Sequence, residues 1–228
     1  MPEVSSTANP QPNWAALFDW DGVIIDSSRH HEESWERLAR EIALPLPNGH
    51  FKKGFGRKNE FIIPEILSWS SEEGQIRQLS LRKEALYREV VADWGLEPLP
   101  GVRTWLSRLR DAGVPCAIGS STHRANIDLS LGLIGLAEFF VAIVTAEDVK
   151  QGKPDPEVFV KGAQALGARP ERCVVFEDAL VGIAAARAGG MKVVAVATTH
   201  PVEELGMADL PVRRLDELEV ATLAKWFP

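Results

Sequence analysis

The run Ala15-Ala16-Leu17-Phe18-Asp19-Trp20-Asp21-Gly22 has the composition of a buried strand that ends on two carboxylates. In an extended chain alternate side chains point to the same side, so Asp19 and Asp21 crowd two like charges at one site. That crowding is unfavourable unless a cation lies between them or one carboxyl keeps its proton. Gly22 then allows the backbone to turn tightly. An Asp-rich turn that only closes a strand is the alternative interpretation.

Further short apolar runs predict additional buried strands at 116–119, 142–145, 173–176 and 192–197. Residues with helical spacing lie between them, at 102–109, 158–166 and 179–188, and a glycine follows soon after each of these patterns. Strands that alternate with helices indicate right-handed crossovers and a parallel sheet with helices on both faces. The sequence therefore predicts an α/β fold with a doubly wound, Rossmann-like core.

The segment between the first two predicted strands is far longer than an ordinary connection. It contains two amphipathic helical patterns, at 35–42 and 79–94, and no convincing buried strand. We therefore expect residues 28–97 to form a helical cap inserted after the first strand. The catalytic core then comprises 14–27 and 98–228. Residues 1–13 are expected to be a disordered tail, because they are polar and lack the regions of a signal peptide.

Composition excludes several classes of partner. The 228 residues carry a formal net charge of -7 without a basic run, which argues against a nucleic-acid surface. No segment approaches the roughly 18 apolar residues of a membrane span. The two cysteines lie beside apolar stretches and predict buried thiols in a reducing compartment. We expect a cytoplasmic monomer that acts on a small phosphorylated metabolite.

Polar side chains follow the ends of the predicted strands, where ligands bind in open parallel sheets. In chain order they are Asp19, Asp21, Ser120, Lys153, Glu177 and Asp178. Each has a structural alternative. Ser120 could cap the next helix, Lys153 could be a solvated loop lysine, and the Glu177-Asp178 pair could cap the alanine-rich helix. Their occurrence on successive strand ends favours a common site.

This set of side chains suits phosphoryl transfer. A carboxylate such as Asp19 is able to act as nucleophile and form an aspartyl phosphate. The acidic cluster would repel a phosphate dianion, and a hard divalent cation, best Mg²⁺, removes that problem. Ser120 and Lys153 would then hold the remaining phosphate oxygens.

Four motifs, Asp19-Trp20-Asp21-Gly22, Ser120, Gly152-Lys153-Pro154 and Glu177-Asp178, resemble in order and spacing those of the haloacid dehalogenase superfamily. The resemblance covers residues 15 to about 210, and the insert resembles the β-phosphoglucomutase-like and phosphatase branch. It implies that Asp19 is the nucleophile and Asp21 the general acid/base. It also implies metal ligation by the Asp19 carboxylate, the Asp21 backbone carbonyl and Asp178, with Glu177 assisting. Asp21 argues against dehalogenases proper and phosphonate hydrolases, which lack that acid.

The insert carries residues that bear on the substrate. His31 and the segment with Lys53 and Arg57 resemble positions that β-phosphoglucomutases use for closure and for gripping the second phosphate. A helix histidine and a solvated basic loop are the structural alternatives. Arg124 stands where those mutases carry an asparagine, and an arginine there is able to bind a phosphate or a carboxylate.

We therefore expect a Mg²⁺-dependent phosphatase that hydrolyses a small phosphate monoester, such as a sugar phosphate, through an aspartyl phosphate on Asp19. A phosphosugar mutase of the β-phosphoglucomutase type, with the same nucleophile, is the alternative. A catalytically silent phosphate-binding protein is a third possibility, and the retention of Asp19, Asp21, Lys153 and Asp178 argues against it.

Overall fold

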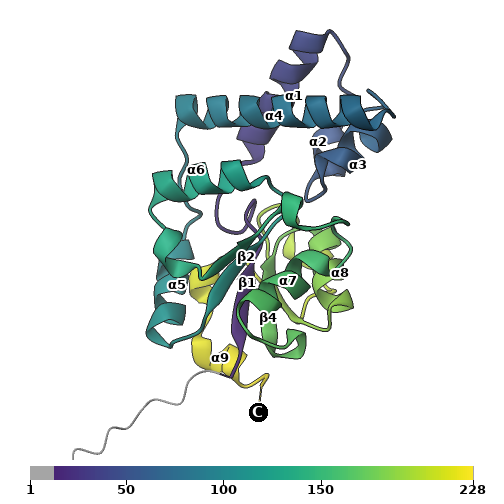
Figure 1. The fold of residues 1–228 in the computed structure, drawn as a ribbon. Coiled ribbons are helices and arrows are strands. Elements are labelled where there is room, and N and C mark those ends of the chain that lie inside the picture. Colours follow the sequence, from purple (N-terminus) through teal and green to yellow (C-terminus); the bar gives the residue numbers. More distant parts are fainter. Residues whose placement is uncertain (1–12, 228) are drawn as a thin grey trace, which may run out of the picture.

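The computed structural model describes residues 13–227 and shows an α/β core beneath a group of helices (Figure 1). Within these residues the sheet has six parallel strands in the order β3-β2-β1-β4-β5-β6. The strands are β1 (Ala15–Phe18), β2 (Cys116–Gly119), β3 (Ala142–Val144), β4 (Cys173–Glu177), β5 (Lys192–Val196) and β6 (Leu210–Val212). This order is that of doubly wound folds, so the predicted fold class is confirmed.

Helices fill the connections between strands. The α-helices are α1 (Ser28–Ile42), α2 (His50–Gly54), α3 (Asn59–Phe61), α4 (Glu73–Trp94), α5 (Val102–Asp111), α6 (Arg124–Ile134), α7 (Glu157–Ala165), α8 (Leu180–Ala188) and α9 (Val220–Ala224). A π-helical turn, Ile62–Ile66, continues α3. Short 3₁₀ turns lie at Ala137–Phe139, Ala146–Asp148, Pro170–Arg172, Val202–Glu204 and Leu215–Glu217. Of the predicted tail over residues 1–13, residues 1–12 lie outside the described residues, and the side-chain amide of Asn13 donates to the carbonyl of Phe227 at 2.8 Å.

The sheet is buried on both faces. Leu17 and Phe18 are neighbours in β1, and their side chains enter two different apolar cores. Phe18 stacks on Phe176 of β4, with ring centroids 4.5 Å apart, and Trp105 of α5 meets Phe176 edge-on. On the other face Leu17 belongs to the core that contains Phe159 of α7. Helices α5, α6 and α9 therefore cover one face, and α7 and α8 cover the other.

The apolar runs of the sequence do not predict β6. This strand has only three residues, and the central one is Pro211, which cannot donate a hydrogen bond to a neighbouring strand. It is tolerated because β6 is the last strand of the sheet. A three-residue run interrupted by proline has no periodicity that predicts a strand.

Helices α1 to α4, which we call the cap, lie over the edge of the sheet where β1, β2 and β4 end (Figure 1). The cap has an apolar core of its own, in which Trp35 of α1 meets Trp69 edge-on at 5.8 Å between ring centroids. Leu38, Ile63 and Leu86 pack in the same cluster. The exact boundaries of the cap as a domain stay a prediction.

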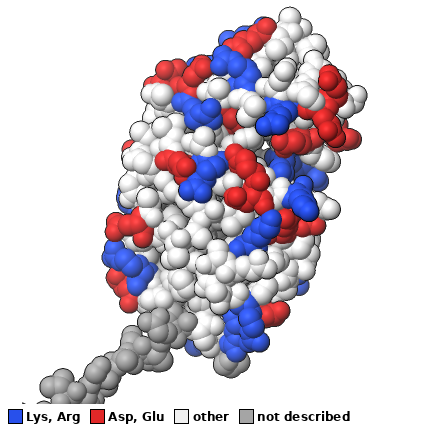
Figure 2. Space-filling model, in the orientation of Figure 1, with Lys and Arg blue, Asp and Glu red and all other residues white. Residues whose placement is uncertain are grey.

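Surface charge is mixed on the face shown in Figure 2, where Lys and Arg are interspersed with Asp and Glu. Among the helices of residues 13–227, none combines the length and the apolar character needed to cross a bilayer. The expected monomeric state, cytoplasmic location and lack of nucleic-acid partners stay predictions.

Candidate active site

Lys153 joins the ends of two strands. It is 3% exposed, and its Nζ lies 3.0 Å from Oδ1 of Asp19, directly after β1, and 2.6 Å from Oε1 of Glu177, the last residue of β4. A buried ammonium between two carboxylates is not a solvated loop lysine, so that alternative is wrong. The structure thus brings together residues from strand ends that are more than 130 positions apart in the chain.

Glu177 is committed to protein partners through both of its oxygens. Oε1 accepts from Lys153, and Oε2 accepts from the backbone N–H groups of Asp178 and Ala179 at 2.7 and 2.6 Å. These N–H groups precede α8, which has no side-chain capping hydrogen bond, so the alternative in which the Glu177-Asp178 pair caps that helix is not what the structure shows. This geometry favours a role for Glu177 in holding Lys153 over direct assistance to a metal.

Close packing around Glu177 predicts a strong effect of Gly182→Ala. A Cβ atom at Gly182 would lie 1.6 Å from Oε1 of Glu177. We expect this substitution to lower the free energy of unfolding by about 2–4 kcal/mol, because buried Glu177 and Lys153 have no room to move. Urea unfolding measures this. Gly132→Ala in α6 is the matched control, since nothing lies within 4 Å of its Cβ position, and it should be neutral or stabilising. Equal effects of the two substitutions would contradict the prediction.

The donors present suit a hard divalent cation. Carboxylate oxygens of Asp19, Glu177 and Asp178 all lie within 4.8 Å of one another, and all three residues are buried. Three carboxylates face the single ammonium of Lys153, so the cluster carries excess negative charge. Oδ1 of Asp178 is buried without a hydrogen-bond partner in the described residues, while Oδ2 accepts from the hydroxyl of Thr199. Mg²⁺ would complete this cluster, and it prefers such oxygen ligands.

Electrostatics at the cluster also point to a missing positive charge. Burial raises the pKa of Asp19 to about 7, opposed by Lys153 and reinforced by repulsion from Glu177 and Asp21. Burial and the charges of Glu177 and Asp19 likewise raise the pKa of Asp178 well above its usual range. A divalent cation would relieve both effects.

Gly22 confirms the predicted tight turn and brings the chain against the cluster. Its φ of +79° is favourable only for glycine, and a Cβ there would lie 1.9 Å from Oδ2 of Asp178. The hydroxyl of Thr198 donates to the Gly22 carbonyl and ties this turn to the end of β5. The first motif is therefore held directly against the fourth.

Asp21 lies in a different environment from Asp19. The hydroxyl of Ser27 donates to its Oδ1, the hydroxyl of Thr122 donates to its Oδ2, and Nε2 of His31 lies 3.3 Å from Oδ1. Burial alone would raise the pKa of Asp21, but His31 and these hydroxyl donors outweigh it and hold the pKa below its usual range. Without a cation these directions favour a proton on Asp19 over one on Asp21, so attack by Asp19 requires the positive charge that a divalent cation would add to the cluster. The Asp21 side chain lies outside the acidic cluster, and ligation through its backbone carbonyl stays a prediction.

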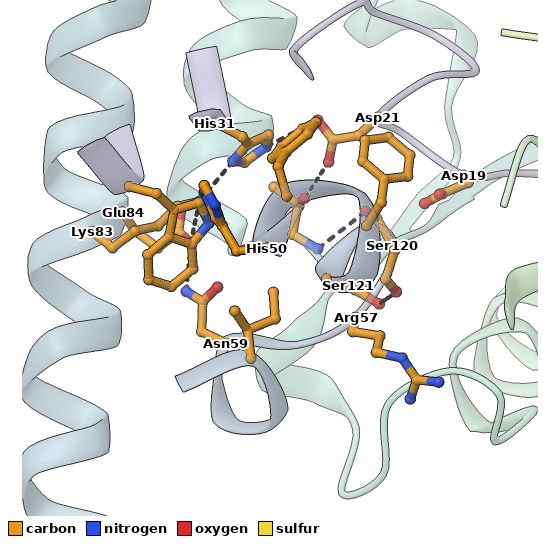
Figure 3. A pocket seen from close by; sticks show the side chains of 17 residues that line it. Asp19, Asp21, His31, His50, Arg57, Asn59, Lys83, Glu84, Ser120 and Ser121 are labelled. Atoms are coloured by element: carbon orange, nitrogen blue, oxygen red, sulfur yellow. Dashed lines mark hydrogen bonds and ion pairs between the residues drawn. The ribbon is translucent and has the colours of Figure 1, made fainter. Parts of the chain in front are cut away.

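A chain of buried polar groups connects α4 to Asp21 (Figure 3). Nζ of Lys83 lies 2.6 Å from Nδ1 of His31 and 3.0 Å from Oε1 of Glu84. An ammonium only donates, so Nδ1 accepts and the proton of the neutral imidazole is on Nε2, facing Asp21. The structure therefore places His31 where it orients Asp21.

Sequence reasoning missed Lys83, Glu84 and Asn59. Glu84 is buried and accepts from the amide of Asn59 at 2.6 Å and from the amide of Asn126 in α6, which links the cap to the core. A signal for Lys83 was present, since it falls four residues after Leu79 on the apolar side of α4. A charged residue on the apolar side of a helix indicates a buried polar network.

A pocket between the cap and the sheet is lined by Asp19, Asp21 and Ser120 from the core and by residues of the cap. In Figure 3 Asp19 and Ser120 lie across the pocket from Lys83 and Glu84. Ser120 is buried, and its Oγ accepts from the backbone N–H of Thr122 at 3.1 Å. It does not cap α6, because that helix begins at Arg124.

The predicted substrate residues of the cap and of α6 have different locations. Arg57 lines the pocket, with its guanidinium 4.3 Å from the ring centroid of Phe61. Lys53 is exposed in α2 and does not line this pocket. Arg124 also lies outside it, paired with Asp128 at 2.8 Å one helical turn further on. The structure brings Arg57 to the site and leaves Lys53 and Arg124 away from it.

Comparison with known proteins agrees with this geometry. The family model of haloacid dehalogenase-like hydrolases matches residues 15–190. The chain belongs to this family. It is 41% identical over 213 residues to the chloroplastic 5-amino-6-(5-phospho-D-ribitylamino)uracil phosphatase of Arabidopsis thaliana. That alignment covers 92% of this chain and 57% of the Arabidopsis protein, so the chain spans just over half of that relative's length.

Other members of this family match over most of both chains. The β-phosphoglucomutase of Bacillus subtilis is 31% identical over 215 residues, which are 92% of this chain and 93% of that protein. The crystal structure of β-phosphoglucomutase from Clostridium difficile superposes with a TM-score of 0.82 at 25% identity, covering 93% and 96% of the two chains. The family match and the phosphatase among the relatives confirm the predicted family and the predicted enzyme class, a haloacid dehalogenase-type hydrolase of phosphoric monoesters.

Proposed function

We propose that this protein is a Mg²⁺-dependent phosphatase that hydrolyses a small phosphate monoester through an aspartyl phosphate on Asp19. The observation that carries the proposal is the contact of buried Asp19 with Lys153 in a cluster where three carboxylates face one ammonium. Asp21, two residues further on, is held by three other donors and is free of that cluster. One carboxylate is thus available to attack and the other to move a proton.

The proposed roles follow from these positions. Asp19 attacks phosphorus, while Lys153 and Ser120 hold the non-bridging oxygens. Asp21 gives a proton to the leaving oxygen and later takes one from the attacking water. Asp19 and Asp178 would hold Mg²⁺, which when bound offsets the repulsion between the carboxylates and a phosphate dianion.

Phosphatase activity is favoured over mutase activity by the cations that line the pocket. A phosphosugar mutase must also grip a second phosphate on its substrate. Lys83 is already engaged by His31 and Glu84, and Arg124 is engaged by Asp128 outside the pocket. Arg57 alone among the described pocket residues has no such partner. The name of the Arabidopsis relative, a phosphatase of a phosphorylated ribityl compound, supports a phosphorylated sugar or polyol as substrate here.

A phosphate-release screen over sugar and polyol phosphates with Mg²⁺ tests the proposal. It should run beside an assay for conversion of β-glucose 1-phosphate to glucose 6-phosphate with a bisphosphate primer. We expect free phosphate from at least one ester and little isomerisation. Efficient isomerisation without phosphate release would favour the mutase, and no turnover on any ester would favour a silent binding protein.

Asp178→Asn is expected to raise the Mg²⁺ concentration for half-maximal activity by about a hundredfold or more. The reason is that Oδ1 of Asp178 is a buried carboxylate oxygen without a hydrogen-bond partner in the described residues, and it has no ion-pair partner such as Asp19 has in Lys153. The stabilising effect of Mg²⁺ on the melting temperature should fall in parallel, which gives a readout independent of turnover. Glu203→Gln, an exposed acid away from the cluster, is the control. An unchanged Mg²⁺ requirement would remove Asp178 from the metal site.

A further inference from the structure

Residues 56–58 of the cap are in direct contact with the core. The hydroxyl of Ser121, two residues after β2, donates to the carbonyl oxygen of Gly56 at 3.0 Å. A Cβ atom at Gly56 would lie 3.2 Å from Cβ of Ala179, so its backbone packs closely against the segment that follows β4. This part of the cap therefore contacts the loops at the carboxyl ends of two neighbouring strands of the site.

Lys58 extends these contacts to the loop that follows β3. Its Nζ donates to the carbonyl oxygens of Ala146 at 2.8 Å and Val149 at 3.2 Å, which lie between β3 and Lys153. Hydrogen bonds from an ammonium are stronger than those between neutral groups. The half-buried Lys58 side chain passes over Gly152, where a Cβ atom would lie 2.8 Å from its Cγ. Lys58 thus fits against the core because residue 152 has no side chain.

Arg57 lies between the two anchored residues and lines the pocket. Figure 3 shows Arg57 on the side of the pocket where Ser120 and Ser121 lie, away from Lys83. Anchors on both sides restrict the backbone of Arg57 before any substrate binds, so binding does not have to order it. If residues 56–58 left the core, Arg57 would move away with them and the pocket would open to water.

We propose that Lys58 is a positioning residue that clamps residues 56–58 onto the core and so holds Arg57 over the pocket. Its ammonium is bound to the carbonyls of Ala146 and Val149 and does not take part in the reaction. It acts by increasing the fraction of molecules in which the segment is seated, that is, in contact with the core. Apparent affinity for a ligand rises with that fraction. The effect on turnover rests on the proposed phosphatase activity, and the clamp itself does not.

Trypsin tests the clamp in the metal-free protein without any substrate. Cleavage after Arg57 requires residues 56–58 to leave the core, and its rate follows the population that has done so. Lys58→Met keeps an apolar side chain and removes both charge-assisted bonds, which together contribute about a hundredfold to the seating equilibrium. A segment seated in about nine of ten molecules would then be seated in about one of ten, so we expect cleavage after Arg57 to be about tenfold faster.

Lys52→Met is the matched control for trypsin, because Lys52 is an exposed lysine of α2 that does not line the pocket. Its cleavage after Arg57 should proceed at the parental rate. An unchanged rate in Lys58→Met would overturn the inference, whatever the protein does with phosphate esters.

Turnover of p-nitrophenyl phosphate with Mg²⁺ is the second arm. In Lys58→Met we expect KM to rise about tenfold and kcat to stay within about twofold, because molecules with the segment seated keep an intact site. A fall in kcat at constant KM would mean that Lys58 acts on the reacting groups and would overturn the positioning role. If the parent released no phosphate from any ester, the proposed function would fail, and the trypsin result would still decide on the clamp.

Gly152→Ala provides an independent arm through the geometry of the contact. Its Cβ would collide with the Lys58 side chain, so we expect faster cleavage after Arg57 and a higher KM, each by about tenfold. In a Lys58→Ala background the collision is absent, and the same substitution should add less than about twofold. Equal effects in both backgrounds would show that Gly152 acts independently of Lys58, and the inference would fail.

Discussion

Asp19→Asn is expected to lower kcat by about 10⁴-fold or more, because an amide does not attack phosphorus. The fold should survive, since asparagine has the same shape as aspartate. At pH 8 the metal-free variant should be at least as stable as the parent, because the substitution removes repulsion from Glu177 and Asp178. Loss of the contact with Lys153 opposes this gain.

The raised pKa of Asp19 also sets the sign of the pH dependence of stability. Burial raises the pKa of Asp19 from 3.8 to about 7, so the folded chain holds a proton that the unfolded chain has already released. Between these values the contribution of Asp19 to the stability of the metal-free protein is lost as the pH rises. Asp19→Asn should flatten that part of the stability curve, which urea unfolding in EDTA measures.

Two observations would verify the nucleophile directly. Acid-quenched parent enzyme should carry covalent phosphate after mixing with a labelled substrate, and the asparagine variant should carry none. Asp93→Asn, an exposed carboxylate on α4, is the control and should retain full turnover and labelling. Near-normal turnover of Asp19→Asn would show that another group attacks phosphorus.

The core of the fold was predictable because a sheet that is buried on both faces is built from continuous apolar runs in the sequence. Strands such as β1 and β4 are continuous apolar runs, and their polar neighbours must lie at one edge of the sheet. Asp19, directly after β1, is predictable on this basis, and so is Lys153 in the loop after β3. Apolar runs fail to predict β6, where an edge position tolerates Pro211 and a short strand needs little apolar character.

The cap side of the site was less predictable because its contacts arise from packing between distant helices. Glu84 gains its partners from α3 and α6, and no local pattern specifies which helices will meet. Arg124 illustrates the converse, because its position one turn from Asp128 favours a local pair on the surface of α6. The location of a charged side chain at the end of a strand is predictable, because parallel strands all end at the same edge of the sheet. The location of a charged side chain on a helix is not, because it depends on which other elements the helix packs against.

Asp21→Asn is expected to lower kcat/KM for a sugar or polyol phosphate by about 10³-fold, because the alkoxide leaving group then has no proton donor. The side chain should stay in place, since the hydroxyls of Ser27 and Thr122 are able to rotate. His31 presents a fixed N–H, so the amide must turn its oxygen toward it. If the amide leaves one buried donor or acceptor without a hydrogen-bond partner, the free energy of unfolding should fall by about 1–3 kcal/mol, which urea unfolding measures separately from activity.

An aryl phosphate separates the proton role of Asp21 from a structural one. Nitrophenolate leaves without a proton, so kcat/KM for p-nitrophenyl phosphate, which reports formation of the aspartyl phosphate, should be nearly unchanged in Asp21→Asn. Hydrolysis of that intermediate still needs a base to activate water, so kcat should fall and a burst of nitrophenol should precede slow turnover. Equal losses of kcat/KM on both kinds of ester would show that Asp21 has a structural role in the pocket. The proton for the leaving oxygen would then come from His31 or from solvent.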